Sequence, residues 1–212
     1  MIKISTSILS VPDRKTAALK LNNTNNDYLH IDVMDGKFVN NLQFSIKEIL
    51  ELEKISTKPL DIHLMAVDPI SYIEKLDNLN INNITFHLEL DQDINRIISQ
   101  IKNKGYKVGI AIKPNTNVEM LKKYLNYIDL VLIMSVEPGY GGQSFISDVL
   151  FKAPEIKSIN PNIELAIDGG VNEDNLSKIK EYNIDMIVVG NYITSSNNYN
   201  EKIDFLKEST II

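Results

Sequence analysis

The chain alternates between short apolar stretches and stretches whose apolar residues follow helical spacing, and it does so eight times. Short runs rich in Val and Ile predict strands, whereas apolar residues three or four apart predict helices. Eight strand-helix units in succession are typical of a (β/α)8 TIM barrel, in which a parallel sheet closes on itself. The predicted strands cover residues 2–9, 28–34, 59–65, 83–90, 107–113, 130–135, 163–168 and 185–190.

The predicted helices lie between these strands. Asp13 can cap the first of them, Ser45 starts the second, and Gly105 ends the fourth. A chain of 212 residues can form one α/β domain with a large core, so we expect a single catalytic barrel over residues 1–212. The helices are expected near residues 14–21, 46–55, 68–79, 94–104, 118–127, before 158, 173–182 and 201–207.

The competing architecture is a doubly wound open sheet. That fold rarely needs eight regular units, and no GxGxxG motif follows the first predicted strand. The barrel is therefore favoured.

Composition excludes several classes of function. The chain has no Cys, which removes disulfides and thiolate chemistry and fits a reducing compartment. Its net charge is -6, with Lys spread evenly, so no basic stripe is available for nucleic acid. No apolar run has the length of a membrane span, and the N-terminus lacks the pattern of a secretory signal. We therefore expect a cytoplasmic protein that binds neither nucleic acid nor membrane.

The second predicted strand carries polar side chains on one face. Residues two apart on a strand share a face, so His30, Asp32 and Met34 lie together and Ile31 and Val33 lie opposite. A turn follows directly, so these groups sit near the C-terminal end of the strand. An isolated HxD pattern would indicate only a buried hydrogen bond in an ordinary core strand.

The same spacing recurs on two further strands, as His63 with Met65 and as His87 with Glu89. In a barrel the C-terminal ends of the strands form one rim, where active sites of this fold lie.

Two imidazoles and two carboxylates from three strands form a candidate metal site at this rim: His30, Asp32, His63 and Asp168. This donor set suits Zn, Mn, Fe or Co better than Ca or Mg. The alternative is that all four are hydrogen-bonded polar residues lining the barrel mouth. His87 is a weaker candidate ligand, because Glu89 could equally hold it in a hydrogen bond behind the metal.

Glycine-bearing loops follow the last three predicted strands. Phosphate often binds in barrels at this place, on backbone N–H groups that glycine leaves accessible. The alternative is that the glycines serve turns that need positive φ. The residues concerned are Gly139, Gly141, Gly142, Gly169, Gly170, Gly190 and Asn191.

Several blocks of the chain resemble the ribulose-phosphate 3-epimerase family, in the same order and over nearly the whole length. They are TSILS from Thr6, HIDVMDGKFVNN from His30, DIHLM from Asp61, MSVEPGYGGQSF from Met134 and IDGGV from Ile167. The resemblance implies an isomerase of the pentose phosphate pathway that interconverts D-ribulose 5-phosphate and D-xylulose 5-phosphate.

The resemblance also implies roles for individual residues. One divalent metal would be held by the four residues of the candidate site, and Asp32 and Asp168 would transfer protons at C3 through an enediolate. The protein would bind a small phosphosugar, and we expect a homo-oligomer. The implied substrate contacts are Ser7, His63, Met34, Met65, Met134, Gly139, Gly141, Gly142, Gly169, Gly170, Gly190 and Asn191.

Three residues depart from the family pattern. Thr6 stands in place of the usual Pro, Lys113 in place of Asn, and Asn191 in place of Ser. None is a candidate ligand, and Asn191 still offers a backbone N–H for phosphate. Lys113 leaves the substrate preference open.

Three other functions compete with this interpretation. A ketohexose-6-phosphate (allulose-6-phosphate) 3-epimerase would use the same chemistry. Lyases of the related decarboxylase and hexulose-phosphate synthase barrels need a DxKxxD motif, whereas the residues from Asp32 to Asp35 include no Lys. A barrel that binds phosphosugars without catalysis would not need both Asp32 and Asp168.

Overall fold

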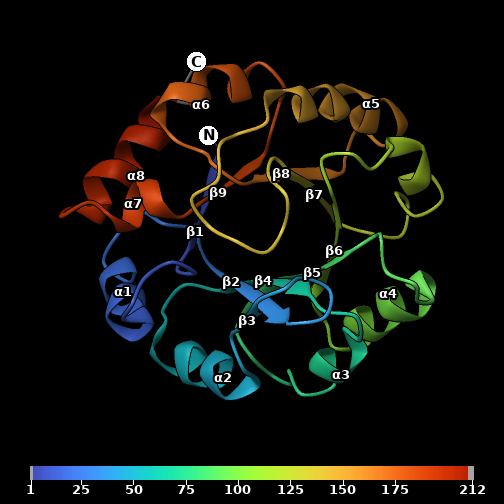
Figure 1. Cartoon of the computed structure of the whole chain (residues 1–212), viewed down its shortest axis with the longest axis horizontal. Helices are drawn as coiled ribbons and strands as arrows, with labels where there is room; N and C mark the ends of the chain where they lie inside the picture. The colour runs from blue at the N-terminus through green and yellow to red at the C-terminus, as the bar shows by residue number, and fades with distance from the viewer. Residues whose placement is uncertain (1, 210–212) are drawn as a thin grey trace.

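The computed structural model describes residues 2–209, in which eight parallel strands close into a (β/α)8 barrel surrounded by helices (Figure 1). The predicted domain over 1–212 also includes residues 1 and 210–212, which lie outside the described residues. The barrel strands are β1 (Lys3–Ser7), β2 (Tyr28–Asp35), β4 (Leu60–Met65), β5 (Ile81–His87), β6 (Lys107–Ile112), β7 (Leu130–Met134), β8 (Glu164–Asp168) and β9 (Met186–Val189).

The barrel closes where β1 pairs with both β2 and β9, its neighbours on either side. Helical segments form the outer ring. They are α1 (Arg14–Leu21), α2 (Ile46–Ile55), α3 (Ile70–Ile73), α4 (Ile94–Asn103), the 3-10 helices η1 (Val118–Leu121) and η2 (Ser147–Phe151), α5 (Lys152–Ile159), α6 (Glu173–Lys180), α7 (Asn191–Thr194) and α8 (Tyr199–Glu208).

Local chemistry explains where the best-defined helices begin. Asp13 accepts a hydrogen bond from the N–H of Thr16 at the start of α1. Ser45 and Glu48 form a capping box at the start of α2, where each side chain accepts from the other residue's backbone N–H. The bounds of α1 and α2 agree with the sequence prediction for this reason.

Two predicted helices are shorter than expected. Residues 118–127 begin with η1 and continue as turns, in which the N–H of Tyr124 bonds to the carbonyl of Leu121, three residues back. The buried residues Val118, Leu121 and Tyr124 are spaced by three, which is the period of a 3-10 helix. The helix expected over 68–79 is regular only as α3, and Asn78 has a positive φ of 55° beyond it.

Two short elements were not predicted. Strand β3 (Leu42–Gln43) folds back antiparallel on β2, and α7 follows directly after Gly190. Both contain too few residues to show a periodic pattern.

Alternate residues of the strands divide between two apolar layers. On β7, Val131 and Ile133 belong to the large cluster that includes the helices, while Leu132 and Met134 belong to a smaller one. The smaller cluster lies on the inner face of the strands and reaches the rim, where Met134, Val136 and Val188 line a cavity. Every helix within residues 2–209 is too short or too polar to cross a lipid bilayer.

Candidate active site

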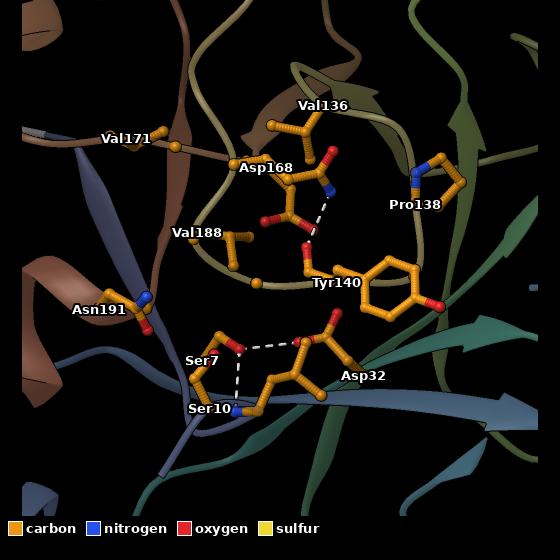
Figure 2. Close-up of a pocket in the computed structure, with 18 of the residues that line it drawn as sticks. Ser7, Ser10, Asp32, Val136, Pro138, Tyr140, Asp168, Val171, Val188 and Asn191 are labelled. Atoms are coloured by element: carbon orange, nitrogen blue, oxygen red, sulfur yellow. Dashed lines mark hydrogen bonds between the residues drawn. The ribbon is translucent and has the colours of Figure 1, made fainter. Parts of the chain in front are cut away.

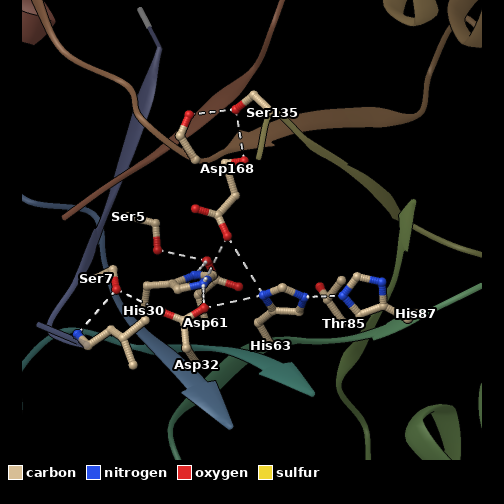
Figure 3. Close-up of polar contacts among 12 residues, drawn as sticks. Ser5, Ser7, His30, Asp32, Asp61, His63, Thr85, His87, Ser135 and Asp168 are labelled. Carbon is tan, nitrogen blue, oxygen red and sulfur yellow. Dashed lines mark hydrogen bonds and ion pairs between the residues drawn. The ribbon is translucent and has the colours of Figure 1, made fainter. Parts of the chain in front are cut away.

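A cavity of about 410 Å³ opens at the C-terminal ends of the barrel strands (Figure 2). Most of the residues singled out from the sequence line it, although they come from distant parts of the chain. These are Ser7, Asp32, Met34, Met65, Met134, Gly139, Gly141, Gly142, Asp168, Gly169, Gly170, Gly190 and Asn191. His30 and His63 are fully buried beside it, among the polar contacts drawn in Figure 3.

The four candidate metal ligands form one cluster. Each offers one ligand atom, and these four atoms all lie within 4.8 Å of one another. Strand register explains part of this arrangement, because Asp32 is paired with His63 across β2 and β4. Asp32 Oδ1 lies 3.2 Å from His30 Nε2 and 3.3 Å from His63 Nδ1.

Asp168 approaches the same cluster from β8. Its Oδ2 atom is 3.9 Å from His30 Nε2 and 3.7 Å from His63 Nδ1. Ser135 fixes the backbone at this point, since its hydroxyl donates to the carbonyl oxygens of Asp168 and Gly169 at 2.8 and 2.6 Å. Two imidazole nitrogens and two carboxylates therefore converge, a donor set that fits a divalent transition metal.

The two aspartates have different electrostatic surroundings. Burial alone would raise the pKa of Asp32, but His30 and His63 outweigh it and hold that pKa below its usual range. Burial and the nearby carboxylate of Asp32 raise the pKa of Asp168 to about 6. Ser7 also favours the ionised form of Asp32, to whose Oδ2 its hydroxyl donates at 2.7 Å. The surroundings thus favour the ionised form of Asp32 and the protonated form of Asp168.

His30 is held from behind by a buried carboxylate. Asp61 Oδ2 lies 2.7 Å from His30 Nδ1 and accepts from the Ser5 hydroxyl at 2.7 Å. Asp61 Oδ1 accepts from Asn83 Nδ2 at 2.6 Å. A metal-binding histidine commonly has its second ring nitrogen held by a carboxylate in this way.

His63 is held from behind by another histidine. Its Nε2 atom lies 2.9 Å from His87 Nε2, and His87 Nδ1 lies 3.1 Å from Glu89 Oε2. Burial lowers the pKa of His87 to about 4, although its hydrogen bond to Glu89 opposes that shift. The structure therefore keeps His87 outside the four-residue cluster.

Three methionines form an apolar wall beside the polar cluster. Met34 and Met65 are neighbours across β2 and β4 and share a small cluster with Val39, and Met134 stands at the end of β7. Each is at most 2% exposed, so these side chains give the cavity an apolar side next to the carboxylates.

The loop that follows β7 carries three of the cavity's glycines and, in Figure 1, runs in yellow across the barrel mouth. Gln143 stabilises the loop, since its Nε2 donates to the carbonyl oxygens of Glu137 and Tyr140 at 2.7 and 2.9 Å. Gly142 has a φ of 76° and Gly170 a φ of 66°, so both adopt conformations that favour glycine. Among residues 2–209, no acceptor receives the N–H of either glycine.

Sequence reasoning gave no role to several residues of the site. Asp61 lies two positions before His63 on one strand face, and this spacing was the available signal. Tyr140 and Gln143 also line the cavity, but a loop has no period from which their direction could be predicted.

Comparisons with known proteins are in keeping with this geometry. The sequence model of the ribulose-phosphate 3 epimerase family matches residues 3–194. The ribulose-phosphate 3-epimerase of Helicobacter pylori (strain J99) is 36% identical over 199 residues, covering 92% of this chain and 92% of that protein. The ribulose-phosphate 3-epimerase of Bacillus subtilis is 31% identical over 217 residues, covering 99% and 100%.

Solved structures of other enzymes share the fold. A 3-hexulose-6-phosphate synthase from Salmonella typhimurium superposes with a TM-score of 0.70 at 13% identity, covering 99% of this chain and 98% of that one. A tryptophan synthase chain from Mycobacterium tuberculosis has a TM-score of 0.73 at 13% identity, covering 100% and 93%. At such low identity the likeness concerns the barrel alone.

Proposed function

The chain belongs to the ribulose-phosphate 3-epimerase family, and we propose that it is a cytoplasmic isomerase that interconverts D-ribulose 5-phosphate and D-xylulose 5-phosphate. The observation that carries this proposal is the convergence of Asp32 and Asp168 on one cavity. The absence of Cys supports the assignment to a reducing compartment.

Epimerisation at C3 needs two proton transfers on opposite faces of the substrate. One base removes the C3 proton, which is acidified by the neighbouring ketone, and an acid returns a proton to the other face of the enediolate. Asp32 on β2 and Asp168 on β8 can exchange these roles, one for each direction of the reaction. The raised pKa of Asp168 suits a group that must both donate and accept a proton.

The four-residue cluster would hold one divalent transition metal, whose identity among Zn, Mn, Fe and Co is open. When bound, this ion supplies a positive charge that stabilises negative charge developing on the substrate oxygens. Ser7 would orient Asp32 through its hydrogen bond, and the three methionines would keep water from the reacting carbon.

The unpaired N–H groups of Gly142 and Gly170 support phosphate binding on the side of the cavity that the glycine-bearing loops form. No Lys, Arg or His is among the described residues that line it, so backbone donors would carry the recognition of this anion. The side-chain amide of Asn191 lies close to Gly142 and offers a further N–H donor. A Cβ placed on Gly142 would lie 3.1 Å from Asn191 Nδ2.

Gly142→Val is expected to lower kcat/KM for ribulose 5-phosphate much more than for ribulose, which lacks phosphate. A Val side chain would strain the backbone at positive φ and meet Asn191, and so would move the N–H donors. Phosphate binding energy helps to orient the reacting carbon, so both kcat and KM should suffer for the natural substrate. Steady-state kinetics with both sugars measures the difference.

Gly105→Val is the matched control, because Gly105 also has a positive φ, 81°, but lies after α4, where a Cβ would meet no atom within 4 Å. It should lose stability without changing the preference for phosphate. Equal turnover of ribulose and ribulose 5-phosphate by the parent enzyme would contradict the proposed phosphate site.

A ketohexose-6-phosphate 3-epimerase remains the second candidate, since Lys113 departs from the family pattern near the rim. Its ammonium group lies 4.6 Å from the ring centroid of Phe38, in the turn that follows β2. The test compares kcat/KM for two substrates. Ribulose 5-phosphate is assayed with a coupling enzyme specific for xylulose 5-phosphate, and the matching hexulose phosphate is assayed beside it. A higher kcat/KM for the hexulose phosphate would overturn the pentulose assignment.

We also propose a homo-oligomer, on the basis of exposed apolar side chains such as Leu42, which is 74% exposed on β3. Light scattering after gel filtration gives the mass in solution, and a purely monomeric protein at micromolar concentration would contradict this proposal.

A further inference from the structure

The loop after β7, residues 136–145, forms one side of the cavity without the hydrogen bonds of a helix or strand. Gly141 and Gly142 are neighbours in it, and neither carries a Cβ that would restrict the backbone. A peptide next to such residues can rotate, so that either its N–H or its carbonyl oxygen faces a ligand. Only the N–H can bind an anion, so the orientation of these peptides decides whether the loop recognises phosphate.

Gln143 holds one of these peptides by its side chain. Its Nε2 atom donates to the carbonyl oxygens of Glu137 and Tyr140 at 2.7 and 2.9 Å, and Figure 2 draws the contact with Tyr140 as a dashed line. Because two carbonyl oxygens accept there, both hydrogens of the side-chain amide are used. The side chain has no donor left for a phosphate, so Gln143 acts on the loop rather than on the ligand.

The contact with Tyr140 decides where the N–H of Gly141 points. A trans peptide is planar, so the carbonyl oxygen of Tyr140 and the N–H of Gly141 lie on opposite sides of the bond that joins these residues. Since Gln143 holds the carbonyl oxygen, the N–H points away from Gln143, and no acceptor within residues 2–209 receives it. Gly141 and Gly142 both line the cavity and therefore offer two successive unpaired donors.

The backbone of Gln143 is held against the glycine turn that follows β8. A Cβ placed on Gly170 would lie 2.7 Å from the backbone carbonyl oxygen of Gln143 and 2.7 Å from the backbone nitrogen of Phe145. The missing side chain of Gly170 therefore leaves room for this part of the loop. The loop then rejoins the barrel where the N–H of Ile146 donates to the carbonyl oxygen of Ser135 at 2.9 Å. Gln143 thus joins the two glycine-bearing loops that carry the proposed phosphate donors.

We propose that Gln143 is a positioning residue for phosphate recognition. It keeps the peptide between Tyr140 and Gly141 turned so that the N–H, and not the carbonyl oxygen, is offered to the anion. This inference rests on the proposed phosphate site and adds the side chain that keeps that site formed. Without the two hydrogen bonds, the peptide is free to reverse, and the carbonyl oxygen of Tyr140 would then repel the phosphate oxygens.

Gln143→Met tests the proposal, because Met has a similar length but no hydrogen-bond donor. We expect kcat/KM for ribulose 5-phosphate to fall by about 10- to 100-fold, the range for one hydrogen bond to a charged group. The value for ribulose, which lacks phosphate, should fall much less, whereas a general loss of structure would lower both equally. Gln100→Met is the matched control, since Gln100 lies on α4 outside the cavity, and it should change neither value.

Titration with inorganic phosphate examines the same site without turnover. ¹H–¹⁵N spectra of the folded protein follow the N–H groups of Gly141 and Gly142, which should shift as phosphate binds. The affinity obtained from these shifts should fall in Gln143→Met by about 10- to 100-fold, as for kcat/KM, and should be unchanged in Gln100→Met.

The role of Gln143 would be overturned by equal phosphate affinity of the parent protein and Gln143→Met, or by an equal fractional loss of kcat/KM for both sugars. If the glycine N–H groups of the parent protein do not respond to phosphate, the inference fails together with the phosphate site. Absence of epimerase activity in a parent protein that binds phosphate would contradict the proposed reaction alone, and the titration would still decide on Gln143. If Gln143→Met does not fold, Gln143→Leu, which also lacks a donor, makes the same comparison.

Discussion

Asp168→Asn is expected to abolish net epimerisation while the protein still folds. An amide of the same shape can neither accept the C3 proton nor return one, and loss of a general acid or base costs about 10²- to 10⁴-fold in rate. Asp32→Asn should have the same effect. The structure supports both expectations, because each carboxylate lines the cavity and lies beside the other at the histidine cluster.

Isotope transfer distinguishes two bases from one. In D₂O, the product of the first turnovers should carry deuterium at C3 while unreacted substrate keeps protium, because the acid that donates differs from the base that accepts. Mass spectrometry of product and substrate quenched after the first turnovers measures this. Predominant protium in early product would contradict the assignment of Asp32 and Asp168.

Metal content must be measured for each variant, because both aspartates are also proposed ligands. Asp148→Asn is a suitable control, since Asp148 is exposed on η2 outside the cavity. Its activity and metal content should match the parent protein. A metal-replete Asp168→Asn enzyme that epimerises at the parent rate would exclude Asp168 as a base.

Removal of metal is expected to lower the epimerase activity by about as much as Asp168→Asn does. Without a bound cation, the divalent charge that would stabilise negative charge on the substrate oxygens is missing. Prolonged dialysis against a chelator should remove the activity, and Zn, Mn, Fe or Co should restore it. Mg, which prefers oxygen donors, should restore it poorly.

Thermal stability gives an independent measurement of the same site. Metal at about 100 times its dissociation constant should stabilise the folded protein by about 2.7 kcal/mol, because only the folded chain assembles the cluster. His63→Ala should remove this stabilisation, whereas the parent protein should show it with a transition metal. Full activity in protein verified as free of metal would contradict the proposed dependence.

The fold could be predicted because strand and helix periods are local, whereas most cavity residues came from the glycine-bearing loops and from the family resemblance. Side chains two apart share a strand face, so His30 and Asp32 could be placed together, and the rim of a barrel brings His63 and Asp168 to them. η1 and α3 are shorter than the helices predicted over 118–127 and 68–79, because tertiary packing decides how regular a short helix becomes. Periodicity also says nothing about which ring nitrogen of His63 faces the cluster. In the structure His63 Nδ1 faces Asp32 and its Nε2 lies against His87 of the neighbouring strand, a contact that no local pattern predicts.

The pairing of β1 with β9 has a consequence for the synthesis of this protein. Lys3 lies beside Met186, so the cylinder cannot be completed until β9 has left the ribosome. Until then, one edge of β1 is unpaired, so a nascent chain is prone to pair with other strands. The site also stays incomplete until Asp168 on β8 joins it, so a nascent chain would be inactive. Contacts between such distant residues also form slowly, so this edge would be protected last.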